Sequence, residues 1–271
     1  MKGLVLDNLR RDQLTDAISK GRRLDGRGMS EYRKLEIQPG VIPKAEGSAR
    51  VKLGDTEVMA GVKIEHGKPF PDTPDQGVLI INAEVLPLAS EYAEPGPPDE
   101  DAIELARVVD RGIRESKMVD VNKLVIVPGK EVYLMYVDIS VISSGGNLFD
   151  ASSYAVVAAL MNTKFKILKQ EENGSVTPTD ETSELPIVDL PVSITAVKIK
   201  KGIILDPDVE EESINDGRLT IAYDQEGNLC AIQKGQASGL KVEEIMEIVK
   251  MGKEKVPEIR EMIRGALEKN G

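Results

Sequence analysis

Residues 138–161 read DISVISSGGNLFDASSYAVVAALM, and this stretch decides the fold. A β-rich apolar run enters a Ser-Ser-Gly-Gly-Asn turn at 143–147 and leaves it in a helical pattern. Glycines let backbone N–H groups approach an oxyanion, and the N-terminus of a helix adds a positive partial charge. No lysine or arginine follows the glycines, because Leu148, Phe149 and Asp150 come next. The stretch therefore predicts the shape of a phosphate site without the cation that would complete it.

Strands and helices alternate on both sides of this stretch. The expected strands are short β-rich runs at 48–53, 56–64, 78–88, 123–127, 132–142, 191–199, 202–205, 218–223 and 229–233. The expected helices cover 100–117, 148–162 and 241–268. Asp99 is the natural N-cap of the first of these helices. This order of elements indicates an α+β fold in two related halves.

The chain also divides into segments of different composition. Apolar residues among charges at 4–20 predict an amphipathic N-terminal helix. The segment 170–186 (QEENGSVTPTDETSELP) is polar and rich in turn residues, so it predicts a boundary. We therefore expect an N-terminal helix and arm over 1–30, a first subdomain over 31–185, and a second subdomain with the C-terminal helix over 186–271.

The composition is that of a globular protein without a membrane span. Of the 271 residues, 41% are apolar and 30% are charged. No run approaches the ~20 apolar residues of a membrane helix, and the N-terminus lacks a signal-peptide core, so a cytoplasmic location is expected. The only cysteine, Cys230, excludes an internal disulfide and a cysteine-rich metal cluster. The only histidine, His66, lies in a loop-like context that argues against a Ser-His-Asp centre. Neither a metal nor a cofactor is expected.

The charge of the chain is unevenly distributed. The net charge is −11, which by itself argues against nucleic acid as a ligand, because phosphate binding rests on lysine and arginine. Residues 1–35, however, carry nine basic and five acidic residues. An anionic ligand meets the local surface rather than the global count. A locally basic face is therefore compatible with the acidic total.

Three arginines follow the helical period within the helix expected at 100–117. Arg107, Arg111 and Arg114 stand at i, i+4 and i+7 and share one face. On one interpretation this is a solvated face, where Glu104 and Glu115 pair with Arg107 and Arg111. On the other it is a stripe that follows phosphates, since guanidinium offers forked donors to phosphate oxygens. The spacing alone favours the solvated face.

A second group of charges lies between two expected strands. Residues 205–218 read LDPDVEEESINDGR and are dense in carboxylates. Carboxylates on a loop can hold Mg²⁺ or transfer protons, but a solvated loop is the commoner case. Arg218 argues against an open metal site, because a cation there would compete with the metal.

These motifs together carry a family resemblance. They are RLDGR at 23–27, EPGPPDE at 94–100, ELARVVDR at 104–111, GGN with DA at 145–151, and LDPD with EES at 205–213. The chain resembles the RNase PH family of phosphorolytic exoribonucleases. More closely, it resembles the non-catalytic RNase PH-type ring subunit of the archaeal exosome.

The resemblance also marks where the chain departs from active members of the family. Their turn reads Gly-Gly-Thr-Arg and holds inorganic phosphate. Gly145 and Gly146 match, whereas Asn147 and Leu148 replace the other two residues. Asn147 can instead cap the following helix, and Asp150 can satisfy its first turn. The phosphate loop is therefore expected to be degenerate.

A second departure concerns the catalytic acids. Active members carry two aspartates six residues apart, and ungapped matching places Glu212 and Arg218 at these positions. Arginine stays cationic and offers neither an acceptor nor a proton-transfer group. The resemblance thus implies no catalytic residue in this chain. The alternative is a phosphorolytic exoribonuclease that is active in its own right through Glu212 or Asp216.

The resemblance further implies an architecture and a set of partners. The fold would be the RNase PH fold (ribosomal protein S5 domain 2-like), with two βαβ-type subdomains and helices packed on mixed sheets. The chain would alternate with a catalytic homologue in a hetero-hexameric ring, a trimer of dimers, with S1-domain cap subunits on one face. Single-stranded RNA would thread the ring past Arg107, Arg111 and Arg114. A third hypothesis, a small-molecule kinase that uses loop 143–146, lacks the longer glycine-rich spacing and the lysine of such loops.

Overall fold

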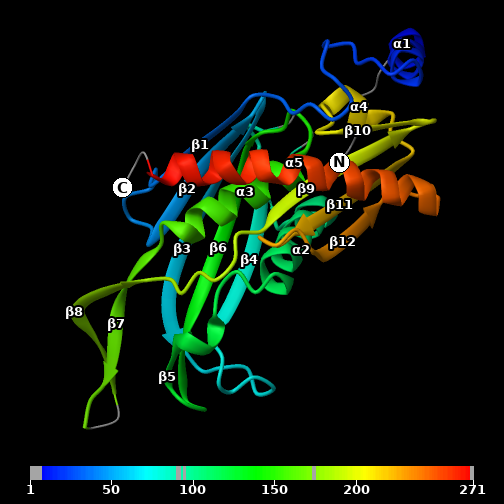
Figure 1. The fold of residues 1–271 in the computed structure, drawn as a ribbon. Coiled ribbons are helices and arrows are strands. Elements are labelled where there is room, and N and C mark those ends of the chain that lie inside the picture. The colour runs from blue at the N-terminus through cyan, green and yellow to red at the C-terminus, as the bar shows by residue number, and fades with distance from the viewer. Residues whose placement is uncertain (1–7, 90–92, 94–95, 173–174, 269–271) are drawn as a thin grey trace.

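The computed structural model describes residues 8–89, 93, 96–172 and 175–268 (Figure 1). Its elements in chain order are α1 (Asn8–Ser19), β1 (Leu35–Pro39), β2 (Gly47–Leu53), β3 (Thr56–Gly67), β4 (Val78–Val85), α2 (Glu100–Glu115), a 3₁₀ turn (Val121–Leu124), β5 (Val125–Val127), β6 (Glu131–Ser143), α3 (Leu148–Met161), β7 (Lys164–Gln170), β8 (Val176–Glu184), β9 (Val192–Ile199), β10 (Gly202–Leu205), α4 (Val209–Ser213), β11 (Gly217–Tyr223), β12 (Leu229–Gly235) and α5 (Val242–Glu268).

The strands form two main sheets and a separate hairpin. The larger sheet has the order β1-β2-β3-β6-β4, with β5 added to β6, and the second sheet has the order β10-β9-β11-β12. β4 and β6 are parallel, so the chain must cross over between them, and α2 makes this crossover. The other paired strands are antiparallel. The expected α+β fold with helices packed on mixed sheets is confirmed.

Helix α3 lies at the centre of the molecule. Its residues from Leu148 to Leu160 are all buried. Most are small or apolar, and the polar side chains of Asp150, Ser153 and Tyr154 form hydrogen bonds in the core. The helix contacts β2 and β3 of the larger sheet on one side and β9 of the second sheet on the other. Both sheets therefore share one hydrophobic core, and α5 lies across the second sheet and next to β1 (Figure 1). The turn before α3 is consequently placed where the two halves meet.

Helix α2 has the cap and the buried face that the sequence predicted. The carboxylate of Asp99 accepts a hydrogen bond from the N–H of Ala102 at 2.9 Å. Leu105, Val109 and Ile113 are buried. The opposite face of α2 is exposed and carries the three arginines.

Several elements differ from the sequence prediction. No strand was predicted in the polar segment 170–186, but it contains the last residue of β7 and the whole of β8, most of whose side chains are exposed. β1 and α4 were not predicted, because β1 has few apolar residues and α4 is a single short turn of acids. The strand expected at 78–88 ends at Val85. Residues 4–7 of the expected first helix and Glu94-Pro95 of the proline-rich motif lie outside the described residues.

Candidate functional site

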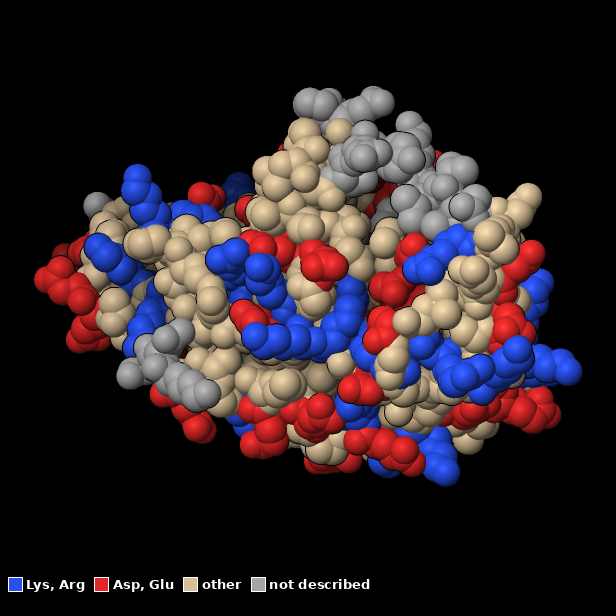
Figure 2. All heavy atoms as spheres, turned by 90° about the horizontal axis from the view of Figure 1, so that it is seen from above, with Lys and Arg blue, Asp and Glu red and all other residues tan. Residues whose placement is uncertain are grey.

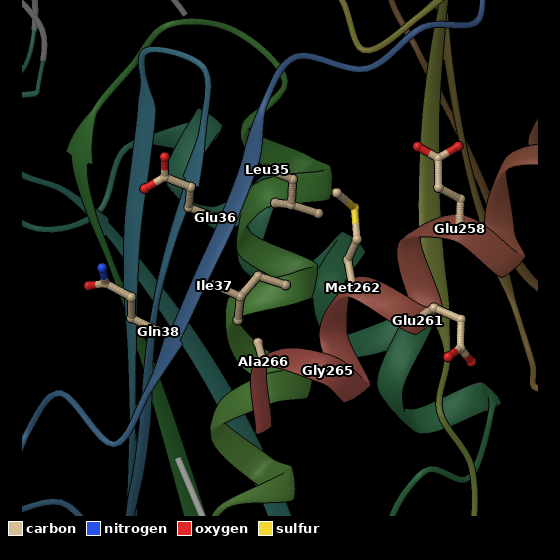
Figure 3. Close-up of a pocket in the computed structure, with 9 residues that line it drawn as sticks. All are labelled: Leu35, Glu36, Ile37, Gln38, Glu258, Glu261, Met262, Gly265 and Ala266. Carbon is tan, nitrogen blue, oxygen red and sulfur yellow. The ribbon is translucent and has the colours of Figure 1, made fainter. Parts of the chain in front are cut away.

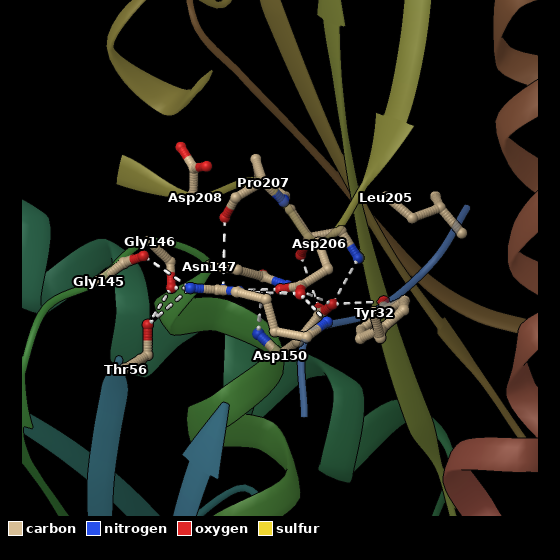
Figure 4. A network of polar contacts seen from close by, with 12 residues as sticks. Tyr32, Thr56, Gly145, Gly146, Asn147, Asp150, Leu205, Asp206, Pro207 and Asp208 are labelled. Atoms are coloured by element: carbon tan, nitrogen blue, oxygen red, sulfur yellow. Dashed lines mark hydrogen bonds and ion pairs between the residues drawn. The ribbon is translucent and has the colours of Figure 1, made fainter. Parts of the chain in front are cut away.

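The turn at 143–147 joins β6 to the N-terminus of α3 (Figure 4). Asn147 adopts the left-handed conformation, with φ 52°. Its side-chain oxygen accepts a hydrogen bond from the N–H of Asp150 at 3.4 Å, so Asn147 caps α3 as predicted. The end of α3 that would attract an anion is therefore capped in part from within the turn.

Asp150 lies in the first turn of α3, and its carboxylate accepts a hydrogen bond from the side-chain amide of the N-cap Asn147 at 2.9 Å. Its carboxylate faces β9 and accepts hydrogen bonds from the N–H of Thr195 at 3.0 Å and the hydroxyl of Thr195 at 2.7 Å. It also accepts from the hydroxyl of Tyr32 at 2.7 Å. Burial raises the pKa of Asp150 to about 6, against the lowering effect of these hydrogen bonds. Asp150 therefore ties α3 to the second sheet.

Both glycines of the turn are required by packing. Gly146 has φ 93°, and a Cβ there would lie 2.5 Å from the carbonyl carbon of Asp208. A Cβ on Gly145 would lie 2.9 Å from the backbone nitrogen of Thr56. Real Cβ atoms do not approach backbone so closely, so only glycine lets the turn fit between these two segments. The glycines that suggested a phosphate loop thus have a structural reason here.

A cation does lie beside the turn, but it contacts the carbonyl groups. The guanidinium of Arg33 donates to the carbonyl oxygens of Gly145 at 2.7 Å and Gly146 at 3.1 Å. The same guanidinium donates to both carboxylate oxygens of Asp206, at 2.7 and 2.9 Å. Burial acts to raise the pKa of Asp206, but the hydrogen bonds and charge of Arg33 outweigh it and lower that pKa. The guanidinium donors of Arg33 are therefore already occupied by acceptors of the chain itself.

The backbone donor of the turn is occupied by an acidic side chain. The N–H of Asn147 donates to Oε1 of Glu212 at 2.8 Å. Burial raises the pKa of Glu212 to about 7, although the Asn147 hydrogen bond and the charges of Arg218 and Arg33 act to lower it. A carboxyl group of α4 thus lies where an oxyanion would approach the turn.

Asp216, the other acid of the alternative hypothesis, bonds elsewhere. Its carboxylate accepts from the N–H of Lys200 at 2.6 Å, in the turn between β9 and β10. Within the described ranges, no group of three or more histidine, cysteine, aspartate or glutamate side chains gathers as it would around a metal ion. The acids of segment 205–218 therefore have different structural roles.

The two remaining departures from the family pattern are both structural in this chain. Leu148, where active members have arginine, begins α3 and is 4% exposed. Arg218 on β11 is also buried, and its guanidinium forms an ion pair with Glu104 of α2 at 2.6 Å. Its Cζ atom lies 4.0 Å from the centroid of the Phe149 ring. Neither position presents a reactive group to solvent.

The three arginines of α2 lie in different environments. Arg107 is exposed, and its side chain makes no ion pair or hydrogen bond with the part of the chain that the structure describes. Arg111 donates to the amide oxygen of Gln233 on β12 at 3.2 Å. Arg114 pairs with Asp110 at 2.6 Å and donates to a backbone carbonyl of β4. The expected pairing of Glu104 with Arg107 was wrong, because Arg218 holds Glu104.

The sequence interpretation did not assign a role to the arginines of segment 23–33. Arg23 is buried and donates to Oε1 of Glu211 at 2.8 Å and to the carbonyl of Leu205 at 2.9 Å. Arg27 forms an ion pair with Asp206 at 3.0 Å. Carboxylates inside the fold thus neutralise part of the excess basic charge of residues 1–35. The sequence carries no local signal for these pairs, because their partners lie about 180 residues away along the chain.

A groove elsewhere contains none of the predicted site residues. It lies between β1 and the C-terminal half of α5, where Leu35 and Ile37 point toward Met262 (Figure 3). Its volume is about 760 Å³, and its lining residues are Leu35, Glu36, Ile37, Gln38, Glu258, Glu261, Met262, Gly265 and Ala266. The groove is apolar with an acidic rim, so it is unsuited to phosphate.

The surface mixes both signs of charge. Figure 2 shows basic side chains gathered among acidic ones on one face, in keeping with a negative total that hides local basic areas. None of the described helices combines the length and the apolar character needed to cross a membrane.

Comparisons with known proteins agree with the fold and the motifs. The 3′ exoribonuclease family, domain 1, matches residues 31–166, and domain 2 of the same family matches residues 189–255. The chain is 50% identical over 264 residues to exosome complex component Rrp42 of Thermococcus kodakarensis, a match that covers 97% of each protein. It is 51% identical over 230 residues to the Archaeoglobus fulgidus protein of the same description, covering 85% of this chain and 86% of the relative.

Solved structures give the same result. A chain from the Archaeoglobus fulgidus exosome with RNA bound to the active site matches with a TM-score of 0.87 and 48% identity, over 94% of this chain and 97% of that chain. A chain from an archaeal exosome core matches with a TM-score of 0.83 and 44% identity, over 95% and 97% respectively.

Proposed function

Because the chain belongs to the RNase PH family of 3′ exoribonucleases, we propose that it is a non-catalytic ring subunit of an archaeal-type exosome. In this role it assembles with a catalytic homologue and guides single-stranded RNA to the partner's phosphorolytic site. Relatives described as exosome complex component Rrp42, matched over nearly their whole length, support the assignment to the exosome.

One observation above all supports the proposal that the chain is non-catalytic. Glu212 occupies the N–H of Asn147, at the turn where active members of the family hold phosphate. A carboxyl group at this point competes with phosphate for that donor, and its ionised form also repels phosphate. Leu148 and Arg218 support the same conclusion, since the first is buried in the core and the second is engaged with Glu104.

The proposed RNA contact is the exposed face of α2. Arg107 and Arg111 present guanidinium groups there, and neither is tied to a carboxylate of the described residues. Arg114 shares the face but is paired with Asp110. Partners in the proposed assembly are the catalytic homologue, in alternating positions of a hexameric ring, and S1-domain cap subunits.

Co-expression with a catalytic homologue tests the proposal. The purified chain alone should release no nucleoside diphosphates from single-stranded RNA in phosphate buffer. The complex should have the mass of a hexamer and degrade RNA from the 3′ end. Substantial release by the chain alone, abolished by Glu212→Gln, would instead establish the alternative of an active exoribonuclease.

A further inference from the structure

We infer that Arg218 is a positioning residue for the RNA-binding face of α2: by holding the carboxylate of Glu104, it leaves Arg107 free to meet an RNA phosphate. The inference rests on the proposed function, because it takes α2 to be the element that meets RNA. It gives a role to a residue that resemblance alone would interpret only as a lost acid.

The ion pair that carries the inference joins two elements distant in sequence. Nη2 of Arg218, on β11, lies 2.6 Å from Oε1 of Glu104, on α2. The Arg218 side chain is 9% exposed and that of Glu104 is 35% exposed. Arg218 therefore reaches Glu104 from the interior and draws its carboxylate toward the second sheet.

The guanidinium of Arg218 is held in place from both sides. Its Cζ atom lies 4.0 Å from the centroid of the Phe149 ring, which adds a cation–π contact. On strand β12, a Cβ on Gly235 would lie 2.5 Å from Nη2 and 2.8 Å from Cζ, so the guanidinium packs against the glycine backbone. This packing fixes the direction in which Arg218 donates. A flexible surface cation would not hold Glu104 in one place.

Without Arg218, Glu104 has an obvious second partner. Arg107 follows Glu104 by three residues, a spacing at which side chains on a helix are neighbours and pair readily. The same helix shows what such an acid does when nothing holds it, because Asp110 pairs with Arg114 at 2.6 Å. Glu104 is instead turned away, and Arg107 has no partner within the described residues.

The consequence for RNA is electrostatic. An arginine committed to a carboxylate must leave that partner before it can bind phosphate, and the freed carboxylate repels the RNA. An exposed ion pair contributes little free energy, so RNA affinity should fall by roughly 1.4-fold to fivefold when the pair can form.

A rescue experiment in the assembled ring tests this role. Arg218→Met, Glu104→Gln and the double variant are compared with the native chain, using fluorescence anisotropy with a labelled oligoribonucleotide. We expect Arg218→Met to weaken binding by the factor given above. Adding Glu104→Gln should restore affinity close to native, because no carboxylate remains to capture Arg107. Damage to the fold would not be repaired by that second change.

Matched controls separate this effect from a general loss of structure. Arg50→Met breaks an ion pair with Glu57 in the larger sheet and should leave RNA affinity unchanged. If Arg218→Met does not assemble, Gly235→Ala displaces the guanidinium without removing it, and the same rescue is expected. Gly217→Ala is the control for that variant, since a Cβ there meets its nearest atom at 3.5 Å.

The outcomes discriminate between the inference and the proposed function. Native affinity of Arg218→Met, or weakened affinity that Glu104→Gln does not restore, overturns the inference. If Arg107→Glu weakens RNA binding in the same assay, the proposed RNA face stands even when the rescue fails. If Arg107→Glu has no effect, both the RNA face and the inference are wrong.

Discussion

Glu212→Gln should make the stability of the chain less dependent on pH. Burial raises the pKa of Glu212 from 4.5 to about 7, against the lowering effects of the Asn147 N–H and of two arginine charges. An acid whose pKa is higher in the native than in the unfolded state stabilises the fold while protonated. This contribution is complete below pH 4.5 and is lost as the pH rises through about 7.

The size of the effect follows from the pKa difference. Each pKa unit between the native and unfolded states corresponds to about 1.4 kcal/mol, so this shift contributes at most about 3 kcal/mol to the free energy of unfolding. Because Glu212 is half-buried rather than enclosed, we expect about 1–2 kcal/mol. Glutamine keeps an oxygen that accepts from the N–H of Asn147, and it does not titrate. The variant should therefore not lose this part of its stability as the pH rises.

Urea unfolding at pH 5, 6, 7 and 8 measures the difference. Between pH 5 and pH 8, the native chain should lose about 1–2 kcal/mol more than Glu212→Gln. Asp150 also titrates with a raised pKa, but it is present in both proteins and cancels. Glu210→Gln is the control, since Glu210 lies on the same helix and pairs with Arg10 at the surface. If the unfolding free energies of the native chain and of Glu212→Gln depend on pH in the same way, the Glu212 carboxyl group is not buried beside the Asn147 N–H.

Three further outcomes are expected. Gly146→Ala should cost about 2 kcal/mol or more in urea unfolding, because φ is 93° and the Cβ would meet the Asp208 backbone; a loss below about 0.5 kcal/mol would contradict this packing. Asp206→Asn should cost about 3 kcal/mol or more by the same measurement, because it leaves Arg33 without its buried carboxylate. Arg107→Glu should weaken RNA binding by the assembled ring and lower the slope of its salt dependence by about 0.7 for each RNA phosphate that is no longer neutralised, and an unchanged slope would place Arg107 off the RNA path.

The sequence predicts best those elements whose signals are local. The turn of residues 54–55 separates β2 from β3 as expected, and α2 begins after Asp99 because that side chain caps it. The position of α3 follows from the apolar run at 155–161 and from the turn before the helix. In each case neighbouring residues supply the geometry, so no distant partner is needed to define the element.

The sequence fails where the defining partner is far along the chain. β8 exposes most of its side chains, so its pairing with β7, not an apolar period, makes it a strand. The site shows the same limit. Matching to the family pattern identified Glu212 as an altered acid, but only the fold brings it to Asn147, 65 residues away in the sequence.

The residues at which this chain departs from the family pattern have structural roles of their own. Leu148 begins the buried helix α3. Glu212 accepts a hydrogen bond from the N–H of Asn147 in the turn. Arg218 packs on Phe149 and pairs with Glu104. Leu148 and Arg218 are held by interactions that the residue types of the active members would break. An aspartate at position 218 would set a second carboxylate beside Glu104, and an arginine at position 148 would have to be buried. Reversion of one of these two positions should therefore destabilise its surroundings before it restores any chemistry.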